Sequence, residues 1–128
     1  MRIKKINHIA IHTNALEETV EFYAKTLGFT VSSFSQDDQF HYVFMELDSV
    51  CTLELFRSRQ SESLADKGQT GVDHLAFDVD NVKAAELELL SQGVELEKPC
   101  AELPQFNTRL LMIKDPNGIS IALREDLL

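Results

Sequence analysis

Hydrophobic and polar residues alternate along residues 5–13, with the period of two that is typical of a β-strand. Apolar residues then recur at helical spacing over residues 15–27, where Asn14 is the expected N-cap and Gly28 the expected end of the helix. Alternation returns in three further segments, which are predicted as strands over residues 29–35, 40–47 and 51–56. The first half of the chain therefore predicts the order β-α-β-β-β.

The same order begins again after residues 58–70, a polar segment without periodicity that has the composition of a linker. A strand is predicted over residues 72–79, followed by a helix that Asp80 or Asn81 caps and that ends before Gly93. Three more strands are predicted over residues 94–97, 108–114 and from the turn at 115–118 to residue 124. Pro99 and Pro104 predict an irregular stretch between the first two of them.

The two halves match as copies of one module. Residues 7–11 (NHIAI) align with residues 73–77 (DHLAF) at an offset of 66, and the glycines that end the helices align at an offset of 65. The segments at 53–55 (LEL) and 121–123 (IAL) align at an offset of 68. We therefore expect an α+β fold in one domain, residues 1–128, with βαβββ modules at about 1–57 and 71–128 joined by the linker 58–70. Two such modules in tandem are expected to form a curved mixed sheet with a concave cleft.

Composition narrows the class of protein. The chain has 128 residues with 12 basic and 21 acidic side chains, a formal charge of −9, and 44% hydrophobic residues. This hydrophobic content is enough for a buried core, whereas the acidic balance excludes a nucleic-acid partner that would need clustered Lys and Arg. No segment predicts a membrane span or a secretory signal. Cys51 and Cys100 form no paired motif, so the expected location is the cytoplasm.

Polar side chains gather on one face of the predicted strands. Because alternate side chains of a strand point to opposite faces, His8, Glu54 and His74 share the predicted concave face. Two imidazoles and a carboxylate are a recurrent ligand set for a divalent transition metal, and they leave positions open for water or substrate. If the two modules close one cleft, these side chains converge on a metal site. The same face supplies four candidates for substrate binding: His12, Thr52, Ser120 and Arg124.

Several segments together resemble a known family: NHIA at 7–10, FY and LGF at the end of the first helix, LEL at 53–55, VDHLAF at 72–77 and DPNG at 115–118. Nearly the whole chain is similar to the vicinal oxygen chelate superfamily, the group of glyoxalase I, bleomycin-resistance proteins and extradiol dioxygenases. The resemblance implies a glyoxalase-like fold, a homodimer, and a divalent metal ion (Zn, Ni, Fe, Mn or Co). That ion would bind a small oxygenated substrate through two neighbouring oxygens, as a Lewis acid.

The family pattern maps its four metal-ligand positions onto His8, Glu54, His74 and Ala122, and Ala122 stands where glyoxalase I has Glu. Carboxylates near the metal of such isomerases also carry the substrate proton, which implies a catalytic role for Glu54. A methyl group cannot carry a proton, so Ala122 argues against lactoylglutathione lyase activity.

Three interpretations of this departure are open. In the first, a three-ligand site serves a metal-dependent lyase, isomerase or dioxygenase. In the second, a β-bulge turns Glu125 inward as a ligand. In the third, a metal-free cleft belongs to a non-catalytic small-molecule binding protein of the bleomycin-resistance type.

Overall fold

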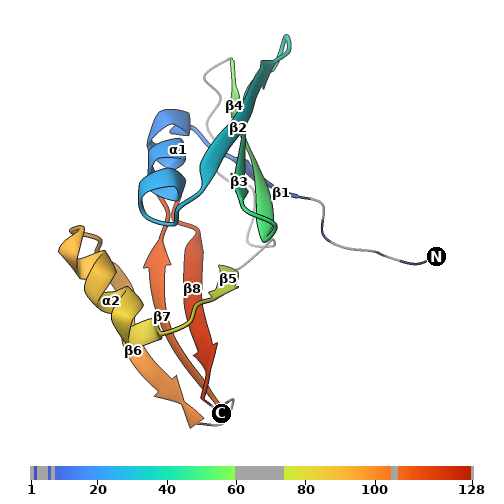
Figure 1. The fold of residues 1–128 in the computed structure, drawn as a ribbon. Coiled ribbons are helices and arrows are strands. Elements are labelled where there is room, and N and C mark those ends of the chain that lie inside the picture. The colour runs from blue at the N-terminus through green and yellow to red at the C-terminus, as the bar shows by residue number, and fades with distance from the viewer. Residues whose placement is uncertain (1, 3–5, 7, 60–73, 105–106, 128) are drawn as a thin grey trace. The chain divides into compact units, whose positions relative to one another are not determined.

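The computed structural model describes residues 2, 6, 8–59, 74–104 and 107–127. The chain divides into two compact units, Met1–Gly68 and Gln69–Leu128. Among the described residues, each unit contains one helix and one four-stranded sheet, which confirms the predicted α+β fold of two tandem modules. Figure 1 labels these elements. Most of the predicted linker, residues 60–70, and the start of the predicted strand 72–79 lie outside the described residues.

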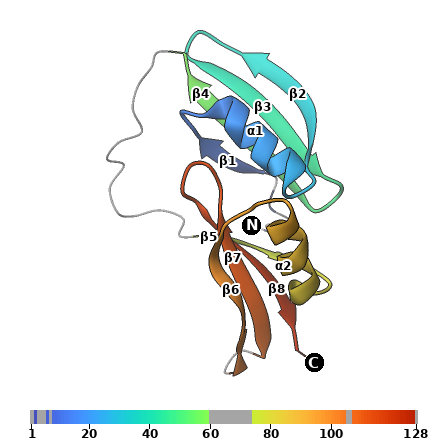
Figure 2. The ribbon, with the colours of Figure 1, turned by 90° about the vertical axis from the view of Figure 1, so that its left-hand side faces the viewer.

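The first unit has the element order β1 (Ile9–His12), α1 (Leu16–Lys25), β2 (Thr30–Gln36), β3 (Phe40–Leu47) and β4 (Cys51–Ser58). Its sheet has the order β1-β4-β3-β2, with β1 parallel to β4 and the other neighbours antiparallel. Helix α1 lies across one face of this sheet (Figure 2). Side chains of that face and of α1 form the core and are at most 6% exposed: Ile11, Leu16, Tyr23, Val43, Met45, Leu53 and Leu55.

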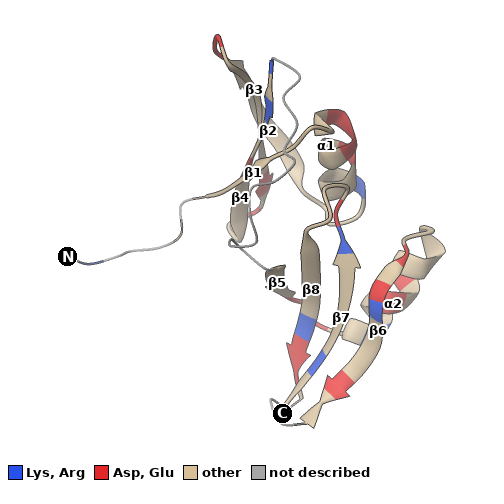
Figure 3. Ribbon diagram, turned by 180° about the vertical axis from the view of Figure 1, so that it is seen from behind, with Lys and Arg blue, Asp and Glu red and all other residues tan. Residues whose placement is uncertain are grey.

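The second unit repeats this design with β5 (His74–Asp78), α2 (Val82–Ser91), β6 (Leu96–Leu103), β7 (Thr108–Lys114) and β8 (Ser120–Asp126). Its strand order is β5-β8-β7-β6, and β5 is parallel to β8 as β1 is to β4. The core again lies under the helix and includes Val82, Leu89, Leu111, Ile113, Ile121 and Leu123. Acidic residues are prominent on both helices (Figure 3), which accounts for part of the negative charge.

Both helices end as predicted, but only α2 begins at a predicted cap. Gly28 and Gly93 have φ values of +80° and +77°, the left-handed conformation that favours glycine just after a helix. Asn81 caps α2, because its side chain accepts a hydrogen bond of 2.9 Å from the backbone N–H of Ala84. The predicted cap of α1 is wrong: its N-cap is Ala15, whose backbone N–H donates to Thr13 Oγ1 at 2.9 Å. Thr13 therefore holds the N-cap residue of α1.

The predicted irregular stretch between residues 97 and 108 is wrong around Pro99, whereas Pro104 lies beyond the end of the strand, as expected. Strand β6 runs continuously from Leu96 to Leu103 and includes Pro99. It tolerates proline because it is the last strand of its sheet, where one side of the backbone needs no hydrogen-bond partner. Its pairing with β7 shifts register between Leu96 and Lys98 and again between Lys98 and Ala101, so the proline lies within a distorted part of the ladder.

Among the described residues, the helices are too short and too polar for any of them to cross a membrane.

Candidate metal centre

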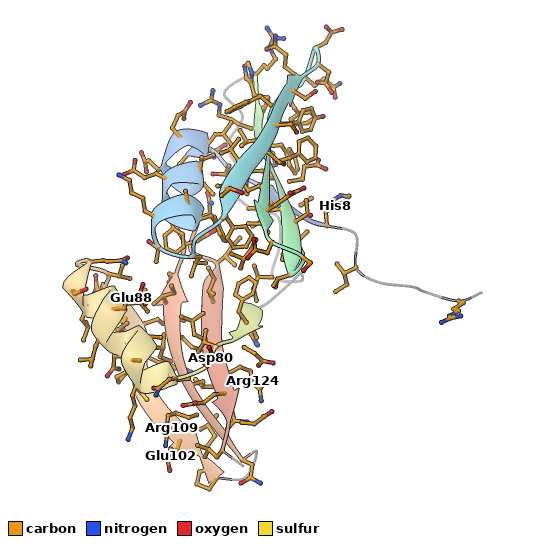
Figure 4. The ribbon with its side chains drawn as sticks, in the orientation of Figure 1. His8, Asp80, Glu88, Glu102, Arg109 and Arg124 are labelled. Carbon is orange, nitrogen blue, oxygen red and sulfur yellow. The ribbon has the colours of Figure 1, made fainter. Side chains whose placement is uncertain are left out.

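His8 and Glu54 approach each other on the face of the first sheet that α1 leaves uncovered. His8 lies one residue before β1 (Figure 4), and Glu54 lies in the middle of β4, opposite Ala10 in the parallel register. The distance between His8 Nε2 and Glu54 Oε2 is 3.4 Å, and the side chains are 41% and 21% exposed. The strand parity expected from the sequence thus brings these two predicted ligands together.

The spacing of this pair fits two ligands of one metal ion. Imidazole nitrogens and carboxylate oxygens bind zinc-like ions at about 2.0–2.2 Å, so two of them at tetrahedral or octahedral angles stand about 3.0–3.5 Å apart. The observed 3.4 Å is within that range. Among the described residues of either unit, no group of three or more His, Cys, Asp or Glu side chains could hold a metal alone.

The second unit presents an imidazole without the carboxylate. His74 is the first residue of β5 and is exposed. Ala76 lies opposite Ala122 in the parallel pairing of β5 and β8, the same relation that Ala10 has to Glu54. Ala122 is 4% exposed and has no donor atom in its side chain. Residue 122 is therefore the structural equivalent of Glu54, and in this unit the equivalent position offers no ligand.

Glu125 does not substitute for the missing carboxylate. Its Oε1 accepts hydrogen bonds from the backbone N–H of Val82 at 3.2 Å and from Arg109 Nη1 at 3.0 Å, so it lies on the side of the sheet that α2 covers. The pairing of β7 with β8 runs without a register shift from Thr108 to Lys114. The interpretation in which a bulge turns Glu125 inward is wrong.

Arg124, a predicted substrate-binding residue, has carboxylate partners within its own unit. Its guanidinium donates to Asp78 Oδ1, to Asp126 Oδ1 at 2.6 Å and to Thr108 Oγ1 at 3.3 Å. Hydrogen bonds to Asp126 and Asp78 raise the pKa of Arg124 above its ordinary value. Two carboxylates thus offset its charge, and an anionic substrate would have to compete with them.

Ser120 and Thr52 occupy equivalent faces of β8 and β4. The hydroxyl of Ser120 donates to Glu97 Oε1 at 2.8 Å, and this hydrogen bond lowers the pKa of Glu97, with Lys114 contributing in the same direction. Thr52 is half-buried and lies opposite Glu46 in the pairing of β3 with β4. Both hydroxyls remain predictions as substrate contacts.

His12 has a role that the sequence did not indicate. Its ring stacks on Phe56, with a centroid distance of 4.7 Å and an interplanar angle of 8°. Phe40, Tyr42 and Phe44 continue this cluster on β3. We call these five residues, His12, Phe40, Tyr42, Phe44 and Phe56, the aromatic face. Its signal was the alternation of Phe40, Tyr42 and Phe44 along the predicted strand, where every second residue is aromatic.

A pocket of about 610 Å³ lies on the opposite side of the same sheet, between α1 and the β2–β3 hairpin. Its walls include Leu16, Phe34 and Val43, and Arg57 Nη1 contacts the carboxylate of Glu17 there at 3.0 Å. Val43 belongs to the helix-covered core, whereas Glu54 points the other way. This pocket is therefore separate from the candidate metal centre.

Comparison with known proteins places these features in a family. The model of the Glyoxalase/Bleomycin resistance protein/Dioxygenase superfamily matches residues 5–123. The chain is 30% identical to the uncharacterized protein YwkD of Bacillus subtilis, covering 98% of this chain and 99% of that protein. It is 25% identical to the mitochondrial methylmalonyl-CoA epimerase of Dictyostelium discoideum, covering 96% of this chain and 79% of the epimerase.

A solved structure agrees with the sequence matches. The crystal structure of a glyoxalase family protein from Enterococcus faecalis superposes with a TM-score of 0.82 at 29% identity, covering 98% of this chain and all of that one. The paired βαβββ units, the His8–Glu54 pair and a family match over nearly the whole chain lead to one conclusion. This chain belongs to the Glyoxalase/Bleomycin resistance protein/Dioxygenase superfamily.

Proposed function

We propose that this protein is a divalent-metal-dependent enzyme, a lyase, isomerase or dioxygenase, that acts on a small substrate with two neighbouring oxygens. His8, Glu54 and His74 are its metal ligands in this proposal. The observation that carries it is the 3.4 Å approach of His8 Nε2 to Glu54 Oε2, because this spacing suits two ligands of one ion. We further expect the protein to work in the cytoplasm as a homodimer.

The residues of the site have distinct tasks. A divalent ion held there would supply Lewis acidity toward the two substrate oxygens. Glu54 has a carboxylate with two oxygens, so one oxygen can serve as a ligand while the other takes up a proton from the substrate. His8 presents its Nε2 toward Glu54 and so fixes where the carboxylate stands. Three protein ligands would leave positions open for the substrate.

Ala122 sets a limit on the reaction. In the first unit the position holds Glu54, whereas in the second it holds a buried methyl group that can neither bind a cation nor accept a proton. A reaction that moves a proton between two carboxylates on opposite sides of a substrate is therefore disfavoured. This supports an activity other than that of lactoylglutathione lyase.

The same observation favours a second candidate, a small-molecule binding protein of the bleomycin-resistance type that needs no metal. Metal analysis separates the two. The protein is purified without chelator, its metal content is measured, and it is then titrated calorimetrically with Mn²⁺, Fe²⁺, Ni²⁺ and Zn²⁺. The enzyme proposal expects one ion per chain. Substoichiometric binding of every ion would overturn it and leave the binding protein.

Variants test the ligands themselves. His8→Ala and His74→Ala should each weaken the affinity for the preferred ion by about a hundredfold, since each removes one of three ligands. His41→Ala is the matched control, because His41 lies on β3 and lines the pocket on the helix side of the same sheet. If the control loses as much affinity as the two ligand variants, the proposed ligand set is wrong.

A further inference from the structure

Five rings in the first unit form one connected aromatic surface. His12 stacks on Phe56, and Phe40 meets both of these rings edge-on, with centroid distances of 6.0 Å to His12 and 5.4 Å to Phe56. Tyr42 connects this group to Phe44, with a centroid distance of 6.5 Å and an interplanar angle of 22°. The surface spans three neighbouring strands, β1, β4 and β3.

This aromatic face begins directly beside the candidate metal ligand. Phe44 lies opposite Glu54 in the antiparallel pairing of β3 with β4, and Phe56 follows Glu54 by two residues on the same face of β4. Tyr42 and His12 flank Phe56 on its two neighbouring strands. A molecule bound through Glu54 would therefore have ring carbons along one side.

Folding of the module does not require these rings. In the second unit the position equivalent to Phe44 is Met112, which lies opposite Ala122, and the position equivalent to Phe56 is Arg124. The position equivalent to Tyr42 is Leu110, opposite Arg124. The second unit has the same strand order without any of these aromatics. The aromatic face is thus a property of one unit and not a demand of the fold.

The rings also stand apart from the buried core. The core of the first unit lies on the helix-covered face, where Leu53, Leu55 and Met45 are fully buried. Phe44 and Phe56 alternate with these residues and are only half-buried. Large apolar side chains that keep accessible ring surface next to a polar site are typical of ligand pockets.

We propose that the substrate of this site carries a planar aromatic or conjugated ring next to its two oxygens, and that Phe44 and Phe56 recognise this ring. The inference rests on the proposed function, because it places the oxygens at the metal ligands. Aromatic rings prefer offset-stacked or edge-to-face neighbours, and the face supplies both ring edges and ring planes. A saturated ring of equal size has no π-system to meet them.

Two ligands that share the same chelating group but differ in their ring test the proposal. Benzohydroxamate and cyclohexanecarbohydroxamate offer the same pair of vicinal oxygens, but only the first has a planar ring. Their dissociation constants are measured by calorimetry on the metal-loaded protein. We expect benzohydroxamate to bind about tenfold more tightly, as is typical for a stacked ring. Burial of apolar area alone would favour the larger cyclohexyl group, so a ratio of one or a reversed preference would overturn the proposal.

Substitutions test whether Phe44 and Phe56 cause the preference for the planar ring. Phe44→Leu and Phe56→Leu should reduce the ratio to about twofold and leave the affinity for the cyclohexyl compound nearly unchanged. Phe34→Leu is the control, because Phe34 is 75% exposed and pairs with Val43, which places it on the helix side of the same sheet. An unchanged ratio in the first two variants, or an equal loss in the control, contradicts ring recognition by the aromatic face.

Failure of the proposed function would be visible separately. Metal content is measured first, and a protein that binds no metal loses the proposed enzyme role. The ring preference is then measured on the metal-free protein with benzamide and cyclohexanecarboxamide by NMR titration. Tighter binding of benzamide, abolished in Phe56→Leu, would retain ring recognition. Equal or absent binding of the two amides would overturn it.

Discussion

Replacing Ala122 by Glu should restore in the second unit the pair that the first unit has. Residue 122 lies opposite Ala76 as Glu54 lies opposite Ala10, and His74 precedes Ala76 by the two residues that separate His8 from Ala10. A carboxylate at position 122 is therefore expected to face His74 at a distance close to the 3.4 Å of the natural pair. Ala122→Glu should add a fourth ligand to the proposed metal site.

The expected gain can be estimated. Structural zinc sites with four ligands bind with roughly 10–16 kcal/mol, so one ligand contributes about 3 kcal/mol, or about a hundredfold in affinity. The metal-free variant should be less stable than the wild type by about 1–3 kcal/mol, because Ala122 is only 4% exposed and a carboxylate there loses hydration. Saturating metal should recover this loss, by about 2.7 kcal/mol at a hundredfold excess over Kd.

Calorimetry and thermal unfolding check both values. The control is Ala84→Glu, which adds the same charge on the exposed side of α2 and separates general attraction of cations from ligation. The reasoning would be refuted if the folded Ala122→Glu protein bound metal no more tightly than the wild type. An equal gain in Ala84→Glu would refute it as well.

Four further outcomes are expected. Leu55→Ala should lower the free energy of unfolding, measured with urea, by about 2–5 kcal/mol, because Leu55 is fully buried under α1. Gly28→Ala and Gly93→Ala should each lower the free energy of unfolding by about 1 kcal/mol. The two losses should be similar, since both φ values are positive and the added methyl would meet no atom closer than 3.9 Å. Ser120→Ala should raise the pKa of Glu97 toward its ordinary value in an NMR titration, because the hydroxyl hydrogen bond lowers it. A carboxyl pKa that is lowered by folding stabilises the fold at pH values above the pKa of the unfolded chain, and this stabilisation is lost as the pH falls through the folded-state pKa. The stabilisation from Glu97 should therefore be smaller in Ser120→Ala. The hemithioacetal of methylglyoxal and glutathione should be turned over poorly, as measured by thioester formation.

Local sequence patterns predicted most of the fold. Alternation located β7 at its true bounds, Thr108–Lys114, and the glycines after the helices marked both helix ends. The errors came from information that a local pattern lacks. Pro99 predicts the end of a strand because proline cannot donate a hydrogen bond within a central strand, and only the sheet order shows that β6 is at an edge. Similarly, the N-cap of α1 is Ala15, whose N–H donates to Thr13, and a local pattern cannot choose between the neighbouring capping residues Thr13 and Asn14.

The candidate site was partly predictable for the same reason. Parity placed Glu54 on the same face as His8, and the family resemblance identified Ala122 as the position without a carboxylate. The contact of Arg124 with Asp78 was not predictable, because Asp78 belongs to a neighbouring strand whose register the sequence does not state. Parity likewise placed Tyr42 and Phe44 on one face of β3 but could not show that the ring of Tyr42 lies against Phe56 of the neighbouring strand β4.

The distorted strand β6 has a consequence for how copies of this chain can meet. An open sheet edge offers a row of backbone N–H and C=O groups to which a foreign strand can add, and this is a common route to aggregation. Along β6, Pro99 offers no N–H, and two register shifts interrupt the straight row. The outer strand of the other sheet, β2, has a shift of its own between Val31 and Ser33. The edges at β6 and β2 are therefore poor templates for strand addition, so copies of this chain are not expected to join through these two strands.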